Sequence, residues 1–143
     1  MVEVRKIVQS GVLPYRIRRD GSPEVLLVTA RQSGRWTIPK GGVAAGLSLR
    51  ASAAKEAHEE AGVRGIVSKT AAAIYNAVKR DGAAQILLEV VVYLLQVEVE
   101  DKDHKEKGVR ERRWCSTEEA ARRLNEPILS ELCRKLAAAR SAA

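Results

Sequence analysis

The sequence predicts an α/β fold in a single domain that spans residues 1–143. Three observations support this prediction. The chain has 143 residues, 45% of them hydrophobic, which is enough for one compact core but not for two. Runs of β-branched and apolar residues occupy much of the chain before position 100. Helical patterns follow a glycine loop near position 41 and also fill the C-terminal end.

The first part of the chain is predicted to form a β-hairpin and then a glycine turn. Residues 7–17 are rich in β-branched and apolar side chains, and residues 24–30 form the continuous apolar run of a buried strand. Asp-Gly-Ser-Pro at 20–23 is a strong turn signal between them. Residues 36–39 then lead into Lys40-Gly41-Gly42, a predicted turn whose glycines permit positive φ or a close approach of the backbone to a ligand.

The next element is predicted to be a helix from Ser48 to Gly62. Ser48 is a suitable N-cap, and Gly62 suits the left-handed position after a helix end. A helical wheel separates two faces, an apolar one and an acidic one. The apolar face carries Leu47, Ala51, Ala54, Ala57 and Ala61, and the acidic face carries Glu56, Glu59 and Glu60.

The remaining chain is predicted to form a second hairpin, a charged loop, a strand and two helices. Apolar segments at 65–78 and 83–99 flank an Asp-Gly turn at 79–82. The loop covers 98–107, the short strand covers 109–115, and helices cover 117–124 and 128–139. In the last helix, Leu129, Leu132 and Leu136 share the face that is expected to contact the core.

Composition excludes several classes of protein. The longest apolar run is interrupted by Glu89 and is too short for a transmembrane helix, and the N-terminus lacks the apolar region of a secretory signal. Two cysteines, Cys115 and Cys133, are too few for a disulfide framework, so we expect a cytoplasmic protein that does not bind membranes. The net charge of +7 favours anionic partners, whereas two Trp, three Tyr and no Phe argue against the aromatic platforms of single-stranded nucleic-acid binders.

The acidic face of the predicted helix is a candidate metal site. Glu56 is spaced i, i+3 from Glu59 and i, i+4 from Glu60, where like charges repel by roughly 0.2–0.5 kcal/mol per pair unless they are neutralised. A solvated helix face is the alternative interpretation of such spacing. A glycine loop one helix length upstream and a glycine that closes the helix favour the metal, because carboxylates and backbone carbonyls form the oxygen environment that Mg²⁺ prefers.

Residues 41–63 resemble the Nudix box of the Nudix hydrolases. The defined positions of that motif are matched by Gly41, Glu56, Ala57, Glu59, Glu60, Gly62 and Val63. The flanks, Trp-Thr-Ile-Pro-Lys-Gly-Gly at 36–42, Arg113-Trp114 and Glu-Glu-Ala at 118–120, are similar to the branch that includes diphosphoinositol polyphosphate and diadenosine polyphosphate hydrolases. The resemblance implies an α/β/α sandwich with a mixed β-sheet between helices.

The resemblance also implies a divalent cation, Mg²⁺ or Mn²⁺, at this helix. We expect Glu56, Glu59 and Glu60 to be metal ligands, together with the backbone carbonyl of Gly41. Glu59 and Glu60 are the candidate catalytic residues. Glu59 is the first candidate for the general base, with Glu89 and Glu111 as alternatives outside the box.

Two positions depart from the family's pattern. Leu47 stands where the box has its first Glu, and Lys55 stands where it has Arg. These two family side chains often pair with each other, so their joint change implies the loss of a supporting ion pair. Leucine can be neither base nor ligand, and lysine lacks the bidentate fork of arginine. The two departures are therefore compatible with three alternatives: reduced activity, a changed metal preference, or a protein that only binds its ligand.

Basic residues are the candidate ligands for substrate phosphates. Arg16 and Arg18, and likewise Arg110 and Arg112, alternate so that each pair would project from one strand face. We expect both pairs to converge with Arg31, Arg35 and Lys40 on a highly phosphorylated ligand, since arginine binds phosphate bidentately. Scattered solubilising charge is the alternative. His104 is expected to be solvated, His58 to be packed or partly exposed, and both cysteines to be core residues.

These observations predict a pyrophosphohydrolase that cuts a phosphoanhydride in a small, highly anionic substrate. Diphosphoinositol polyphosphates and dinucleoside polyphosphates are favoured over ADP-ribose and nucleoside triphosphates. The alternative is a catalytically weakened Nudix module that binds a nucleotide or an RNA as a sensor or regulator. A duplex-binding basic protein is disfavoured because the charges do not form one basic helix. The sequence does not predict an oligomeric state.

Overall fold

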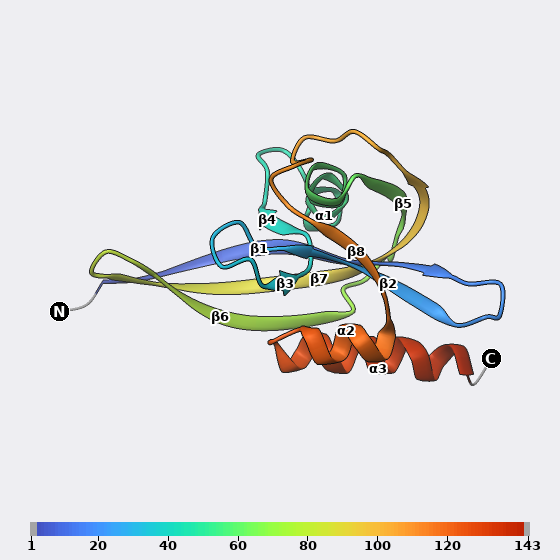
Figure 1. Cartoon of the computed structure of the whole chain (residues 1–143). Coiled ribbons are helices and arrows are strands. Elements are labelled where there is room, and N and C mark those ends of the chain that lie inside the picture. Colours follow the sequence, from blue (N-terminus) through green and yellow to red (C-terminus); the bar gives the residue numbers. More distant parts are fainter. Residues whose placement is uncertain (1–2, 142–143) are drawn as a thin grey trace.

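One mixed β-sheet lies between two layers of helices in the computed structural model, which describes residues 3–141 (Figure 1). The strands are β1 (Val4–Ile17), β2 (Pro23–Thr29), β3 (Trp36–Thr37), β4 (Lys40–Gly42), β5 (Val63–Val67), β6 (Ala73–Asp81), β7 (Ala84–Glu100) and β8 (Arg112–Ser116). The helices are α1 (Leu49–Glu56), which continues into the π-helical turn η1 (Ala57–Ala61), α2 (Thr117–Arg123) and α3 (Pro127–Ser141). This architecture confirms the α/β/α sandwich.

Two long strands form the centre of the sheet. β1 and β7 run parallel, with Val4 to Tyr15 paired to Gln85 to Gln96. The outer edge of β7 is shared by β6 and β5, which pair with its first and last parts. The outer edge of β1 is shared in the same way by β4 and β2, and β2 in turn pairs with β3 and β8. All pairings other than β1–β7 are antiparallel.

The sheet buries apolar side chains on both faces. In β2, Val25 and Leu27 belong to the core beneath α2 and α3, whereas Leu26 and Val28 belong to the core beneath α1. Successive side chains of a strand point to opposite faces, so a strand covered on both sides needs the continuous apolar run seen in the sequence. The predicted core face of the last helix is confirmed: Leu129, Leu132 and Leu136 are buried.

The predicted limits of the box helix are confirmed. The Ser48 hydroxyl accepts a hydrogen bond from the Ala51 backbone N–H at 3.0 Å, and Gly62 adopts a left-handed φ of 70°. The predicted apolar face is partly wrong, because Leu47 and Ala51 are exposed. The buried face runs instead along Ala53, Ala57 and Ala61. Glu60 belongs to the π-helical turn that follows Glu56, and it is buried on the same side as Ala57 and Ala61.

The Lys40-Gly41-Gly42 segment is a strand rather than the predicted turn. Gly41 and Gly42 have no positive φ and pair with Ser10 and Gln9 of β1. The part of β1 that precedes its contact with β2 would otherwise leave backbone groups unpaired, and β4 satisfies them.

Three other predicted boundaries also differ. Segment 65–78 splits into β5 and β6, because both strands pair with successive stretches of the longer β7. Residues 98–100 belong to β7 rather than to a loop, since Glu100 pairs with Val63. The strand predicted at 109–115 begins only at Arg112, after a turn. The Asp-Gly hairpin is confirmed, with Asp81 paired to Ala84.

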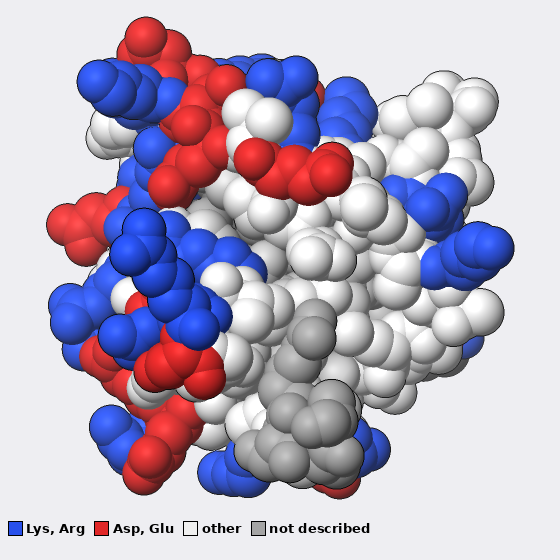
Figure 2. All heavy atoms as spheres, turned by 90° about the vertical axis from the view of Figure 1, so that its right-hand side faces the viewer, with Lys and Arg blue, Asp and Glu red and all other residues white. Residues whose placement is uncertain are grey.

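Charge is unevenly spread over the surface. Figure 2 shows the end of the molecule that carries the β1–β2 hairpin, where side chains of both signs gather toward one side and leave the middle of the face largely uncharged. Among the described residues, no helix combines the length and apolar character needed to cross a membrane.

Candidate functional site

Glu60 is a buried carboxylate at the junction of η1 and β4. It is 4% exposed, and its Oε1 accepts a hydrogen bond from the backbone N–H of Lys40 at 3.3 Å. Burial, and next the neighbouring carboxyl of Glu56, raises the pKa of Glu60 to about 8, against the opposing influence of Arg110. A carboxyl held in this way accepts a cation readily, because ionisation inside the protein needs a positive partner.

Glu56 lies directly against Gly41. A Cβ atom at position 41 would stand 2.5 Å from Cδ of Glu56, closer than nonbonded atoms approach, so any other residue here would displace the Glu56 carboxyl group. Glu56 is also within hydrogen-bonding reach of Glu60. The backbone at Gly41 therefore approaches another group closely, as predicted. That group is the Glu56 carboxylate of the same chain.

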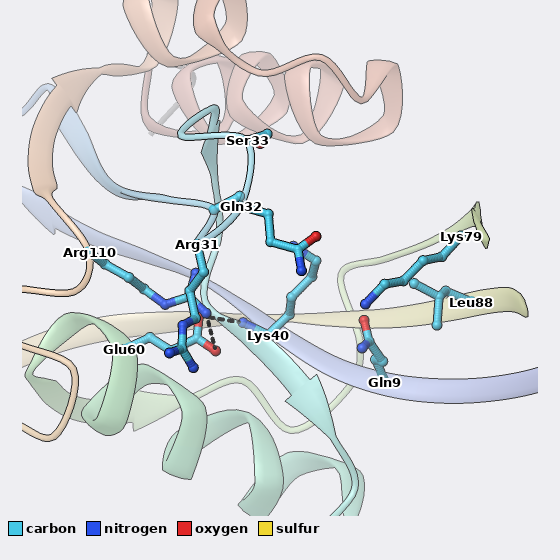
Figure 3. A pocket seen from close by; sticks show the side chains of 10 residues that line it. Gln9, Arg31, Gln32, Ser33, Lys40, Glu60, Lys79, Leu88 and Arg110 are labelled. Carbon is cyan, nitrogen blue, oxygen red and sulfur yellow. Dashed lines mark hydrogen bonds and ion pairs between the residues drawn. The ribbon is translucent and has the colours of Figure 1, made fainter. Parts of the chain in front are cut away.

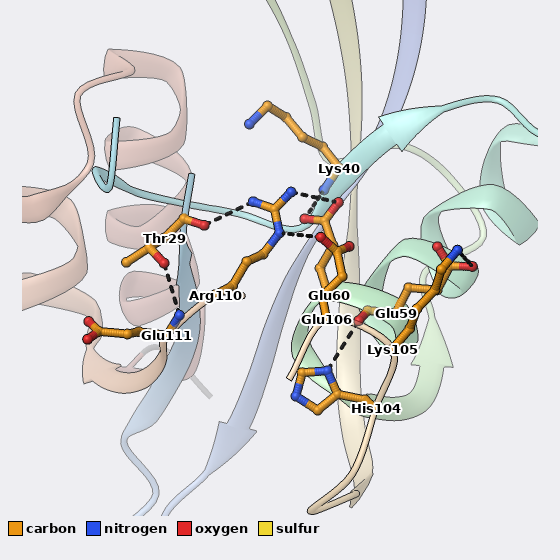
Figure 4. A network of polar contacts seen from close by, with 9 residues as sticks. All are labelled: Thr29, Lys40, Glu59, Glu60, His104, Lys105, Glu106, Arg110 and Glu111. Carbon is orange, nitrogen blue, oxygen red and sulfur yellow. Dashed lines mark hydrogen bonds and ion pairs between the residues drawn. The ribbon is translucent and has the colours of Figure 1, made fainter. Parts of the chain in front are cut away.

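The side chain of Glu59 points away from that of Glu60 (Figure 4). Its Oε1 lies 2.8 Å from Nζ of Lys55 and 3.7 Å from Nζ of Lys105. The hydrogen bond from Lys55 holds the pKa of Glu59 below its usual value. Within residues 3–141, no three acidic, histidine or cysteine side chains converge as a preformed metal cluster. The three predicted metal ligands thus lie on one short segment, but the side chain of Glu59 is directed away from that of Glu60.

Arg110 and Glu106 complete the acidic side of the site (Figure 4). Arg110 Nε donates to Glu106 Oε1 at 3.0 Å, and Arg110 Nη1 donates to the Thr29 carbonyl at 2.9 Å. Arg110 Nη2 lies 3.8 Å from Glu60 Oε2. Sequence reasoning placed Glu106 in a charged loop and missed it. Its spacing of i, i+4 from Arg110 was the available signal.

A cavity of about 440 Å³ opens beside these acids (Figure 3). Most of its charged side chains are basic, and Glu60 is its acidic member. The lining residues are Gln9, Ala30, Arg31, Gln32, Ser33, Lys40, Glu60, Lys79, Leu88 and Arg110. Burial lowers the pKa of Lys40, partly offset by Glu60. Three predicted substrate residues, Arg31, Lys40 and Arg110, meet here, while Gln9 and Lys79 were missed because only the β1–β7–β6 register brings them to the cavity.

The other predicted substrate residues lie elsewhere. Arg35 lines an adjoining pocket of about 290 Å³ together with Trp36 and Tyr75. Arg16 pairs with Glu24 at 3.0 Å and lies over the Trp114 ring, and Arg18 lines a separate depression near Ser116. The structure does not bring these two to the cavity, because β1 carries them past its contact with β4.

The predicted pairing of Arg110 with Arg112 on one strand face is wrong. Arg110 precedes β8 and belongs to a turn, so the two side chains diverge. Arg112 donates to the Ala61 carbonyl at 2.7 Å and lies 3.8 Å from Glu100, which supports the end of η1.

The remaining titratable candidates have ordinary partners. Glu89 lies 3.7 Å from Lys6 on the adjacent strand, and Glu111 is exposed. His58 is exposed and lies 3.3 Å from Asp101, in keeping with the expectation of a partly exposed side chain. His104 is not solvated as expected: it packs against Gly62, and its Nδ1 lies 3.2 Å from the Glu59 carbonyl. Both cysteines are buried.

The donor set suits a hard divalent cation. Glu56 and Glu60 present neighbouring carboxylates with no sulfur or imidazole beside them, and the buried Glu60 needs a positive partner once it ionises. Glu106 stands on the other side of Arg110 and adds a further oxygen donor within the same network. These residues fit the chemistry of a divalent cation, and they lie at the rim of a basic cavity.

Comparison with known proteins gives the same family as the box. The NUDIX domain family matches residues 9–136. Nudix hydrolase 16, mitochondrial, of Arabidopsis thaliana is 29% identical over 85% of this chain and 74% of its own length. Nudix hydrolase 21, chloroplastic, of the same plant is 31% identical over 77% of this chain and 56% of its own length. The chain thus spans between about half and three quarters of these relatives.

Solved structures share the fold at lower identity. An Ap4A hydrolase of C. elegans, in a binary complex, superposes with a TM-score of 0.65 at 21% identity over 96% of this chain and 99% of its own. The M. smegmatis Nudix hydrolase RenU gives a TM-score of 0.59 at 20% identity over 95% of this chain and 87% of its own. The box, the sandwich around it and the family match together show that this chain belongs to the Nudix family.

Proposed function

We propose that this Nudix domain is a divalent-metal-dependent pyrophosphohydrolase acting on a small, strongly anionic substrate. The observation that carries the proposal is the juxtaposition of the Glu56–Glu60 carboxylate pair with a cavity lined by Arg31, Lys40 and Lys79. A phosphoanhydride placed there would have its reacting phosphoryl group beside the metal ligands and its remaining charge beside the basic side chains.

Each part of the site has a separate role in this reaction. A divalent cation such as Mg²⁺ or Mn²⁺, when bound, would supply positive charge for the phosphoryl oxygens and would lower the pKa of a bound water. Glu56, Glu60 and the Gly41 carbonyl would hold that cation. Arg31, Lys40 and Lys79 would orient the phosphate chain, and Lys40 is fixed for this task by its contact with Thr37. Glu59 stays the proposed base of the box. To accept a proton it would have to leave Lys55, whose hydrogen bond lowers the pKa of Glu59 and makes it a weaker base.

Dinucleoside polyphosphates and diphosphoinositol polyphosphates are the proposed substrates. The basic lining favours a ligand with many phosphates over one with few. The adjoining pocket, which shares Lys40 with the first and contains Trp36 and Tyr75, offers an apolar wall beside the phosphates, as a dinucleoside polyphosphate would need. The C. elegans protein of the same fold is by name an Ap4A hydrolase, which agrees with this choice.

A substrate panel tests the proposal. Purified protein is assayed with Mg²⁺ and with Mn²⁺ on inositol pyrophosphates, diadenosine polyphosphates, ADP-ribose and nucleoside triphosphates. We expect turnover of a polyphosphate that needs the metal and falls by about 10² or more in Glu60→Gln. Glu131→Gln, which alters an exposed acid on α3, is the matched control and should keep normal turnover. Normal turnover in Glu60→Gln would remove the assigned chemistry.

A second candidate is a weakened module that binds such ligands as a sensor. Leu47, at the first Glu position of the box, is 40% exposed, and Lys55 pairs with Glu59 instead. A sensor would bind polyphosphates across the panel without turnover. If the enzyme is only impaired, Leu47→Glu would restore a partner for Lys55 and raise the rate, whereas in a sensor it would leave the rate at zero.

A further inference from the structure

We propose that Arg110 is an exchangeable counter-ion. It pairs with Glu106 and lies beside Glu60 in the metal-free protein, and it turns to the substrate's phosphates when a divalent cation takes these carboxyl groups. This inference rests on the proposed function and assigns to one residue the coupling between metal binding and phosphate binding.

The contacts of Arg110 place it between two carboxylates. Its guanidinium lies 3.8 Å from Glu60 and donates to Glu106 at 3.0 Å, and its third contact is the Thr29 carbonyl at 2.9 Å (Figure 4). The side chain of Arg110 is 13% exposed. A largely buried cation between two acids occupies the kind of position that a metal ion takes, and an arginine cannot relieve the crowding by losing its proton.

Arg110 also faces the cavity. It belongs to the same lining as Arg31, Lys40 and Lys79, so it borders both the acids and the space proposed for phosphates (Figure 3). A divalent cation on Glu60 would repel the guanidinium of Arg110 and would take over the carboxyl groups that it contacts. The planar fork can then make bidentate hydrogen bonds to a phosphate, and the Thr29 carbonyl remains as an anchor on the opposite side.

Arg112 shows what a supporting arginine looks like in the same region. It donates to the Ala61 carbonyl at 2.7 Å and lies near Glu100, and the cavity lining does not include it. Both residues carry the same charge and lie near η1. Arg112 is therefore the matched control, because its loss removes an equal charge without freeing Glu60 and Glu106.

The exchange predicts a definite coupling. Without substrate, Arg110 competes with the cation for the carboxylates and weakens metal binding. With metal bound, the freed guanidinium strengthens phosphate binding. Linkage requires that each ligand then raise the affinity for the other by the same factor. A merely structural arginine would produce neither effect.

Titration calorimetry of the whole chain tests the exchange with Mn²⁺ alone, with inorganic pyrophosphate alone and with both. We expect Arg110→Gln to bind Mn²⁺ about tenfold more tightly than the wild type in the absence of pyrophosphate. We also expect it to lose most of the Mn²⁺-dependent gain in pyrophosphate affinity. Arg112→Gln should retain wild-type values for both. Circular dichroism checks that each variant is folded, and Arg110→Met, which is also uncharged, replaces Arg110→Gln if the latter unfolds.

Unchanged or weaker Mn²⁺ binding in the Arg110 variant, with the wild type binding Mn²⁺ normally, would overturn the exchange and leave the proposed function standing. The same gain in Arg112→Gln would also overturn it, because it would show a general effect of charge. A wild-type protein that binds no divalent cation would overturn both the exchange and the metal-dependent function.

Discussion

Glu60→Gln should abolish a pH dependence of stability that the wild-type protein owes to one buried carboxyl. Glu60 is 4% exposed, and its pKa rises from 4.5 to about 8, chiefly through burial. Between these values the folded protein holds a proton that the unfolded chain releases. The stabilisation is complete below about pH 4.5, declines as the pH rises and is lost above about pH 8.

The size of the effect follows from proton linkage. Within the window, the free energy of unfolding falls by about 1.4 kcal/mol per pH unit for one proton. Between about pH 5.5 and pH 7.5 the wild type should therefore lose about 2.5 kcal/mol through Glu60. Glutamine at position 60 keeps a neutral side chain of similar shape, so the variant should lack this loss.

Urea unfolding of both proteins at the two pH values, with a chelator present, measures the effect. The two proteins share every other titratable group, so the difference between wild type and variant isolates Glu60. Glu59→Gln is the matched control, because Lys55 holds the pKa of Glu59 below its usual value and outside the window. A wild-type loss below about 0.5 kcal/mol, or an equal loss in Glu60→Gln, would refute the reasoning.

Two further predictions test the site and the core. Gly41→Ala should reduce Mn²⁺ affinity by about tenfold or more, because the new Cβ displaces Glu56, whereas Gly42→Ala has open space around it and should bind Mn²⁺ normally; calorimetry distinguishes them. Leu129→Ala should lower the free energy of unfolding by about 2–4 kcal/mol in urea, since it empties part of the core beneath α3. Ile128 is the neighbouring residue and is 38% exposed, so Ile128→Ala should lower the free energy of unfolding by much less. Equal losses in the two variants would contradict the assigned packing.

Local signals were sufficient for the elements that the backbone itself controls. The helix start at Ser48, its end at Gly62 and the Asp-Gly hairpin were predicted correctly, because capping and turn conformation depend on a few neighbouring residues. The apolar face of the box helix was predicted only in part, because Leu47 precedes the helix and Ala51 lies in its first turn, and both are exposed there.

The residues of the site were also predicted only in part. The box located Glu56 and Glu60 beside Gly41 correctly, since their spacing is short and one helix carries both acids. It did not show that Lys55 and Lys105 draw Glu59 to the other side. The expected convergence of Arg16 and Arg18 on the other cations failed, because alternation along a strand determines a face but not how far the strand extends.

The sequence by itself determined the family and the helix that carries Glu56, Glu59 and Glu60, because the motif and the caps are properties of neighbouring residues. Tertiary structure decided which basic residues line the cavity and which residues contact the buried Glu60. Lys79 and Gln9 reach that cavity through the register of β6, β7 and β1, and Glu106 and Arg110 reach Glu60 through the path of a loop. Contacts of this kind join residues far apart in the chain, so no local pattern encodes them.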